Sequence, residues 1–146
     1  MKWKLTVVLV LWIVSACASP GQPAKTIQVT DPWMRAANAG ANVNTAAYMT
    51  IRNTGRTADR LVKVTSDVAG AVELHQTTMS GDVMKMAPVE GGIDVPAGGE
   101  AQLKAGGLHV MFIGVTRDLV AGEKITLKLQ FEQAGEIAVE AEVRKP

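Results

Sequence analysis

Residues 108–115 read Leu-His-Val-Met-Phe-Ile-Gly-Val. The apolar residues Leu108, Val110 and Phe112 alternate with His109 and Met111. Because successive side chains of a β-strand point to opposite faces, this alternation predicts a strand with one apolar face in the core. His109 and Met111 then share the opposite face of the same strand.

Similar β-favouring segments recur along the chain from Thr26 and are separated by Gly, Asn, Asp or Pro. Strands are predicted at residues 26–29, 45–51, 60–65, 71–76, 83–86, 91–95, 101–103, 108–115, 124–131 and 137–143. No segment repeats apolar residues at a sustained helical period, so a long helix is not expected. The pattern predicts an all-β fold in one domain, residues 26–146: an antiparallel β-sandwich, a Greek key of cupredoxin-like or immunoglobulin-like type.

The composition suits one globular domain, with 146 residues, 47% hydrophobic and 20% charged. The 15 basic and 14 acidic residues leave no excess charge for phosphates, so we expect no nucleic-acid partner. We also expect no enzyme, because the sequence has no G-x-S-x-G, HExxH or phosphate-loop motif. Asp67, Glu73 and Asp82 are interpreted as solvated residues of turns and strand exteriors.

The N-terminus carries the pattern of an export signal. Lys2 and Lys4 precede an apolar run of ten residues, Leu5–Val14. That run is too short for a transmembrane helix, which needs about 20 residues, and fits the apolar region of a secretory signal.

Small residues stand directly before Cys17, the single cysteine, as in the bacterial lipobox. We therefore expect a lipoprotein-type signal peptide over residues 1–16, lipidation at Cys17 and a tether over residues 17–25. The protein would then be exported and held on a membrane surface by its acyl chains. The alternative is an ordinary signal peptide cleaved nearby, with Cys17 incidental.

The two histidines of the chain, His75 and His109, both fall in predicted strands. The order is His75, ten residues, Met86, 22 residues, His109, one residue and Met111. Thioether sulfur is a soft, uncharged donor that selects Cu(I) and binds Zn, Ca or Mg poorly. A set of two imidazoles and two thioethers also avoids free cysteine, which forms disulfides in exported compartments. We interpret these four residues as ligands of one Cu(I) ion.

Several alternatives stay open at this point. Met commonly fills irregular cores, and core filling is the alternative for Met84, Met86 and Met111 taken singly. Met79 is either a transient fifth donor or a hydrophobic lip of the site, and assistance from Met84 is also open. An electron-transfer blue-copper site requires a Cys thiolate with two His, and Cys17 is expected to be lipidated, which argues against that class. The remaining rival is a lipid-anchored, immunoglobulin-like module that binds a protein partner and no metal.

The sequence resembles the periplasmic copper chaperone family called PCuAC, copper chaperones for the CuA centre of cytochrome c oxidase. The resemblance extends from about Val29 to Val143 and is carried by residues 33–35, 47–51 with Asn53, 72–75, 82–86, 95–99 and 106–111. The family's His, Met, His-x-Met motif falls on His75, Met86, His109 and Met111. One departure follows His75, where this chain has Gln76 and Thr77 and relatives often carry Glu, Met or His.

The resemblance implies a cupredoxin-like sandwich that holds Cu(I) at an exposed surface site. It also implies a location on the periplasmic face of a bacterial membrane. The copper would pass to a receiving protein, either the CuA subunit of cytochrome oxidase or another copper chaperone. We expect a monomer, with the membrane surface contacted through the lipid anchor.

Overall fold

The computed structural model describes residues 26–145, and this part of the chain consists of β-strands and their connections. The predicted signal peptide, Cys17 and the tether over residues 17–25 lie outside the described residues. The strands are β1 (Ile27–Arg35), β2 (Gly40–Asn53), β3 (Asp59–Thr65), β4 (Ala69–Ser80), β5 (Val83–Pro88), β6 (Ile93–Val95), β7 (Glu100–Leu103), β8 (Leu108–Val115), β9 (Lys124–Phe131) and β10 (Gly135–Arg144). Across these residues there is no helix of the length and apolarity that crossing a bilayer requires.

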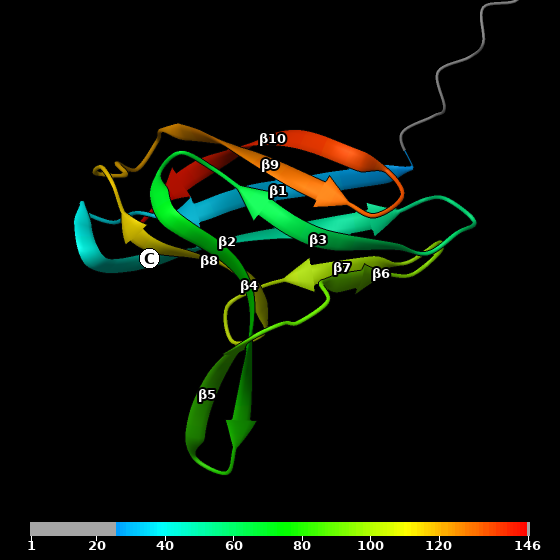
Figure 1. Cartoon of the computed structure of the whole chain (residues 1–146), viewed down its shortest axis with the longest axis horizontal. Helices are drawn as coiled ribbons and strands as arrows, with labels where there is room; N and C mark the ends of the chain where they lie inside the picture. The colour runs from blue at the N-terminus through cyan, green and yellow to red at the C-terminus, as the bar shows by residue number, and fades with distance from the viewer. Residues whose placement is uncertain (1–25, 146) are drawn as a thin grey trace, which may run out of the picture.

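All ten strands expected from the sequence are confirmed, but several are longer than predicted. β1 continues to Arg35 through an irregularity between Thr30 and Trp33. Asp31, which lies in this irregularity, has a positive φ of 46°. β2 already begins at Gly40, and β4 continues to Ser80. The extension of β4 matters for the site, because it carries the strand beyond the body of the sandwich (Figure 1).

The strands form one continuous sheet in the order β5-β4-β8-β7-β2-β1-β10-β9-β3-β6. The sheet folds over on itself, with β1 pairing with β2 on one side and with β10 on the other. β3 lies against β4 and β6 against β7, so that the two halves enclose a core. The predicted sandwich is confirmed, with one qualification: the β1–β10 and β7–β8 pairings are parallel, whereas the other pairings are antiparallel.

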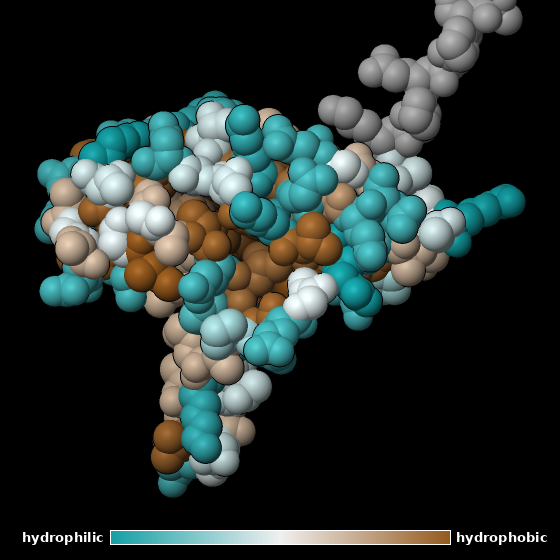
Figure 2. Space-filling view, viewed as in Figure 1, coloured by the Kyte–Doolittle hydropathy of each residue, from teal (hydrophilic) through white to brown (hydrophobic). Residues whose placement is uncertain are grey.

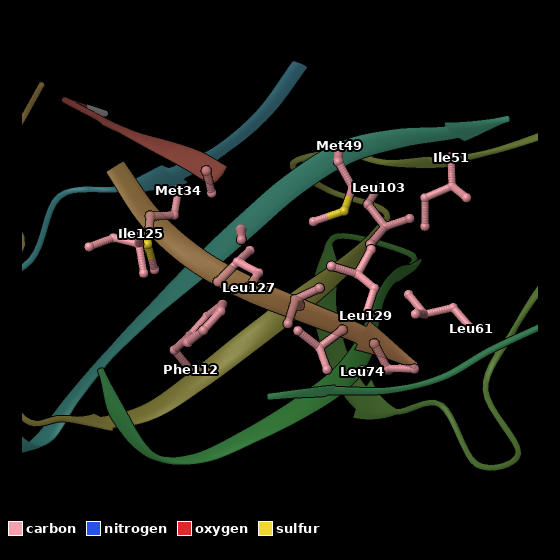
Figure 3. Packing of buried hydrophobic residues seen from close by; sticks show 14 of the residues in the cluster. Met34, Met49, Ile51, Leu61, Leu74, Leu103, Phe112, Ile125, Leu127 and Leu129 are labelled. Carbon is pink, nitrogen blue, oxygen red and sulfur yellow. The ribbon is translucent and has the colours of Figure 1, made fainter. Parts of the chain in front are cut away.

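The core lies between the two layers, where the apolar faces of β2, β4, β8 and β9 meet (Figure 3). In β9 buried and exposed residues alternate without exception, and in β8 the buried Val110 and Phe112 point inward. Met34 and Met49 are also buried and fill the core as ordinary apolar residues. The predicted division of β8 into a core face and a face with His109 and Met111 is confirmed.

The substitution Phe112→Ala should lower the free energy of unfolding by about 3–5 kcal/mol, because it leaves a cavity at a fully buried position. Chemical denaturation followed by circular dichroism measures this change. Val120→Ala serves as the control, since Val120 is 58% exposed and its truncation should change stability by less than about 0.5 kcal/mol. Equal effects of the two substitutions would contradict the assignment of Phe112 to the core.

Candidate metal centre

The pairing of β4 with β8 brings the two histidines together. These strands are antiparallel neighbours, and their register places His75 directly opposite His109. The centroids of the two imidazole rings lie 5.9 Å apart, and the ring planes are inclined at 55°. Two residues far apart in the sequence therefore form one cross-strand pair on a single face of the sheet.

One nitrogen of each imidazole is held by a hydrogen-bond acceptor. His75 Nε2 lies 2.8 Å from Glu73 Oε2, and His109 Nδ1 lies 3.0 Å from the carbonyl oxygen of Gly107. Carboxylate and carbonyl oxygens only accept, so these ring nitrogens carry the N–H and donate. These contacts fix both the orientation and the tautomer of each ring.

In the neutral ring, the other nitrogen carries a lone pair that meets no hydrogen-bond donor among the described residues. His75 Nδ1 and His109 Nε2 are both buried, and neither has a hydrogen-bond partner among residues 26–145. Buried polar atoms without partners are rare in folded proteins, and each calls for an explanation. Ligating histidines are typically held in this way, with one ring nitrogen bonded to a carboxylate or a backbone carbonyl and the other directed at the metal. The two orphaned nitrogens therefore fit a pair of metal ligands.

The two methionines of the predicted ligand set flank this histidine pair. Met111 follows His109 by two residues in β8, and Met86 of β5 pairs with Thr77, two residues beyond His75. Met86, Met111 and His109 line one surface cavity of about 340 Å³. The register thus gathers all four predicted residues on the same face of neighbouring strands.

The four residues differ in their contact with solvent. His109 is only 3% exposed and the side chain of His75 12%, whereas Met86 is 50% exposed and Met111 is half-buried. The sequence predicts an exposed site, and the structure exposes it to solvent only where Met86 and Met111 lie. The imidazoles form a buried floor, and the thioethers border the opening to solvent.

A row of aromatic rings packs behind His109. Trp33 of β1 stands opposite Tyr48 of β2, with ring centroids 4.7 Å apart, and Tyr48 lies 6.4 Å from His109. Tyr48 is buried, so this row supports the imidazole from the side of the sheet.

The far end of the aromatic row is held by charge. The guanidinium of Arg144 lies 5.7 Å from the Trp33 ring centroid and also binds the Asp31 carboxylate at 2.6 Å. The hydrogen bond and the positive charge of Arg144 lower the pKa of Asp31 below its usual value. This pair lies at the surface, and Arg144 contacts both the Asp31 carboxylate and the Trp33 ring.

Sequence reasoning missed two of the residues that build this site. Glu73 was interpreted as a solvated strand residue, but its carboxylate is bonded to His75. The signal was present, because residues two apart in a strand share a face. Tyr48 had no comparable signal, since its place beside His109 depends on the register of strands that are distant in the sequence.

The donor types at the site limit the metals that it suits. Within residues 26–145, no three His, Cys, Asp or Glu side chains gather in a group that could hold a metal ion. The face instead combines the imidazoles of His75 and His109 with the thioethers of Met86 and Met111. Such a set favours Cu(I) over the harder divalent ions.

Comparison with known proteins gives consistent results. A family model described as "Putative lipoprotein LpqE-like" matches residues 27–143. A protein of Leifsonia xyli subsp. xyli, described as a "Putative lipoprotein", is 32% identical over 147 residues, which cover 95% of this chain and 87% of that protein.

Two solved structures are similar to this fold along most of its length. The copper-bound PCuAC domain from PmoF2 superposes with a TM-score of 0.69 at 27% identity, covering 83% of this chain and 94% of that domain. The solution structure of the Cu(I) form of DR1885 from Deinococcus radiodurans gives a TM-score of 0.60 at 31% identity, covering 84% of this chain and 82% of that protein.

The two histidines should occupy opposite tautomers in the metal-free protein. We expect the proton on Nε2 of His75 and on Nδ1 of His109, because Glu73 and Gly107 accept from those atoms. Two-bond proton–nitrogen NMR correlations of the neutral imidazoles distinguish the two forms. Glu73→Ala should release His75 into a mixture of tautomers and leave His109 unchanged. The same tautomer in both rings would refute this arrangement.

Proposed function

The chain belongs to the LpqE-like lipoprotein family and to the PCuAC copper chaperones that share its fold, and on this premise we propose that it carries Cu(I) outside the cytoplasm and passes it to a partner. As a carrier it binds the ion and releases it unchanged, without catalysing a reaction. The observation that supports this function best is the pair of buried, unpartnered imidazole nitrogens on His75 and His109. Each ring is oriented by a hydrogen bond at its other nitrogen.

We assign the Cu(I) ligands to His75, His109, Met86 and Met111 in a roughly tetrahedral arrangement. Cu(I) carries a single positive charge, and four neutral donors bind it without a carboxylate in direct contact. Glu73 acts one step away, because its bond to His75 Nε2 leaves Nδ1 free for the ion.

The exposure of the thioethers suits transfer of the ion. A receiving protein can displace an exposed ligand first, and Met86 on the projecting hairpin is the most accessible of the four. Met111 is half-buried and the two imidazoles lie deeper. Release would therefore begin at the sulfur side and end at His109. We propose that the receiver is the CuA subunit of cytochrome oxidase or another copper chaperone.

The first equivalent of Cu(I) should bind with two nitrogen and two sulfur neighbours, measured by X-ray absorption on the protein loaded anaerobically with one equivalent. Met111→Leu should weaken Cu(I) binding by about tenfold or more, since even residues that only orient a ligand contribute 10–100-fold. Leu retains the apolar volume of Met, so the unfolding free energy of the metal-free protein should change by less than about 1.5 kcal/mol.

The variant with His75→Ala and His109→Ala should lose tight Cu(I) binding altogether. Competition with a chromophoric Cu(I) chelator measures the affinity of each variant. Equal copper uptake by the wild type and this double variant would overturn the proposal and favour a protein-binding module without metal.

We also propose that lipidation of Cys17 holds the carrier at the periplasmic face of the membrane. Membership of a lipoprotein family supports this location, as does the run of small residues before Cys17. Several acyl chains on one residue suffice for stable anchoring, since each buried CH₂ contributes about 0.8 kcal/mol. The anchor would confine delivery to receivers at the same membrane surface.

Mass spectrometry of the mature N-terminal peptide tests the anchor directly. The wild-type protein should begin at Cys17 and carry a diacylglyceryl adduct, and Cys17→Ala should abolish the adduct. Ala18→Ser serves as the control and should retain it. A mature wild-type chain with an unmodified Cys17, or one that begins elsewhere, would refute the anchoring mode.

A further inference from the structure

The β4–β5 hairpin exposes methionines that the predicted ligand set does not use. It projects from the sandwich as an arm (Figure 1), and all six residues of β5 are exposed. Met79 is 62% exposed and Met84 65%, so neither contributes to the core. Figure 2 shows apolar side chains along this arm, which projects from the layered body of the protein.

The register of the hairpin places its methionines on one face. Met79 pairs with Met84, and Thr77 pairs with Met86. Directly opposed residues of an antiparallel pair share a face, with Cβ atoms about 4.5–5.5 Å apart. Met84 and Met86 are two residues apart in β5, about 7 Å along the strand, and share that face as well. It is also the face on which His75 lies, two residues before Thr77.

We propose that Met79, Met84 and Met86 form a second, labile Cu(I) site through which the ion enters and leaves the carrier. This inference rests on the proposed function of the main centre. Three thioethers are neutral, soft donors that suit Cu(I) and discriminate against Zn, Ca and Mg. The flexible Met side chain, with three rotatable bonds, lets sulfurs from opposed positions reach a common ion.

The position of Met86 connects the two sites. It belongs to the hairpin triad, and with Met84 it also lines the cavity that contains Met111 and His109. A Cu(I) ion can therefore keep Met86 as a ligand while it exchanges Met79 and Met84 for Met111 and the imidazoles. The exchange changes neither the oxidation state of copper nor the protonation of any thioether.

The exposure of the triad shows that packing in the core does not account for these residues. Burial of a Met side chain stabilises a protein, and the exposed Met79 and Met84 forgo most of that contribution. An apolar docking surface would serve equally well with Leu, whereas a copper site requires the thioethers. This difference separates the two explanations experimentally.

The first experiment follows the methionine methyl groups by NMR during anaerobic titration with Cu(I) supplied as its acetonitrile complex. The first equivalent should shift the methyl signals of Met86 and Met111. With Met86 held in the main centre, further Cu(I) should still bind the other two thioethers of the hairpin and shift the methyl signals of Met79 and Met84. The buried Met34 and Met49 are internal controls and should not respond. Unchanged Met79 and Met84 signals in excess Cu(I) would overturn the inference.

The second experiment compares Met79→Leu/Met84→Leu with Val83→Leu, which alters the apolar surface of the same hairpin without removing sulfur. The double variant should retain one tightly bound Cu(I), lose the weaker one and release copper to a chelator several-fold more slowly. Val83→Leu should behave as the wild type in all three measurements. Equal release rates in the double variant and the wild type would refute the exchange role.

The two proposals fail in different ways. Shifts of Met86 and Met111 without any response at Met79 and Met84 would remove the labile site and leave the main centre intact. Absence of a response at Met86, Met111 and both imidazoles would remove the main centre, and with it the function on which this inference rests.

Discussion

The candidate centre depends on the register between β4 and β8, which sets His75 opposite His109. A slip of one residue in either strand would send one ring to the opposite face, because side chains alternate with a period of two. The register is held by the core side of the same strands, where Leu74, Val110 and Phe112 are buried. The apolar face therefore specifies the position of the polar face, and the chemistry of the site follows from the packing of the sandwich.

A carrier must hold its ion firmly and still release it, and the structure divides these requirements between two regions. The imidazoles lie on the neighbouring strands β4 and β8, and each is held by a hydrogen bond. The His109 ring also lies near the Tyr48 ring. The thioethers lie at the opening of the cavity and along the β4–β5 hairpin. In this hairpin β5 forms the edge of the sheet, and only β4 has a further neighbour, β8. In the proposed carrier, retention would come from the fixed region and exchange from the accessible one.

Local patterning was sufficient to predict every strand, since alternation of apolar residues and turn-forming residues is visible within each segment. It did not predict the extension of β1 past Asp31, because a non-glycine residue with positive φ leaves no clear local signal. Donor chemistry and a family resemblance predicted the four candidate ligands, and the register places them on one face. The contact of His75 with His109 could not be predicted, because strand register between distant segments is decided by the whole core.

The hydrogen bonds that orient the two imidazoles differ in how easily a mutation can remove them. His75 is oriented by a side chain, Glu73, so a single codon change can delete its acceptor. His109 is oriented by the main-chain oxygen of Gly107, which every amino acid possesses. Substitution of Glu73 can therefore change the orientation of His75. The orientation of His109 changes only when the backbone at Gly107 moves.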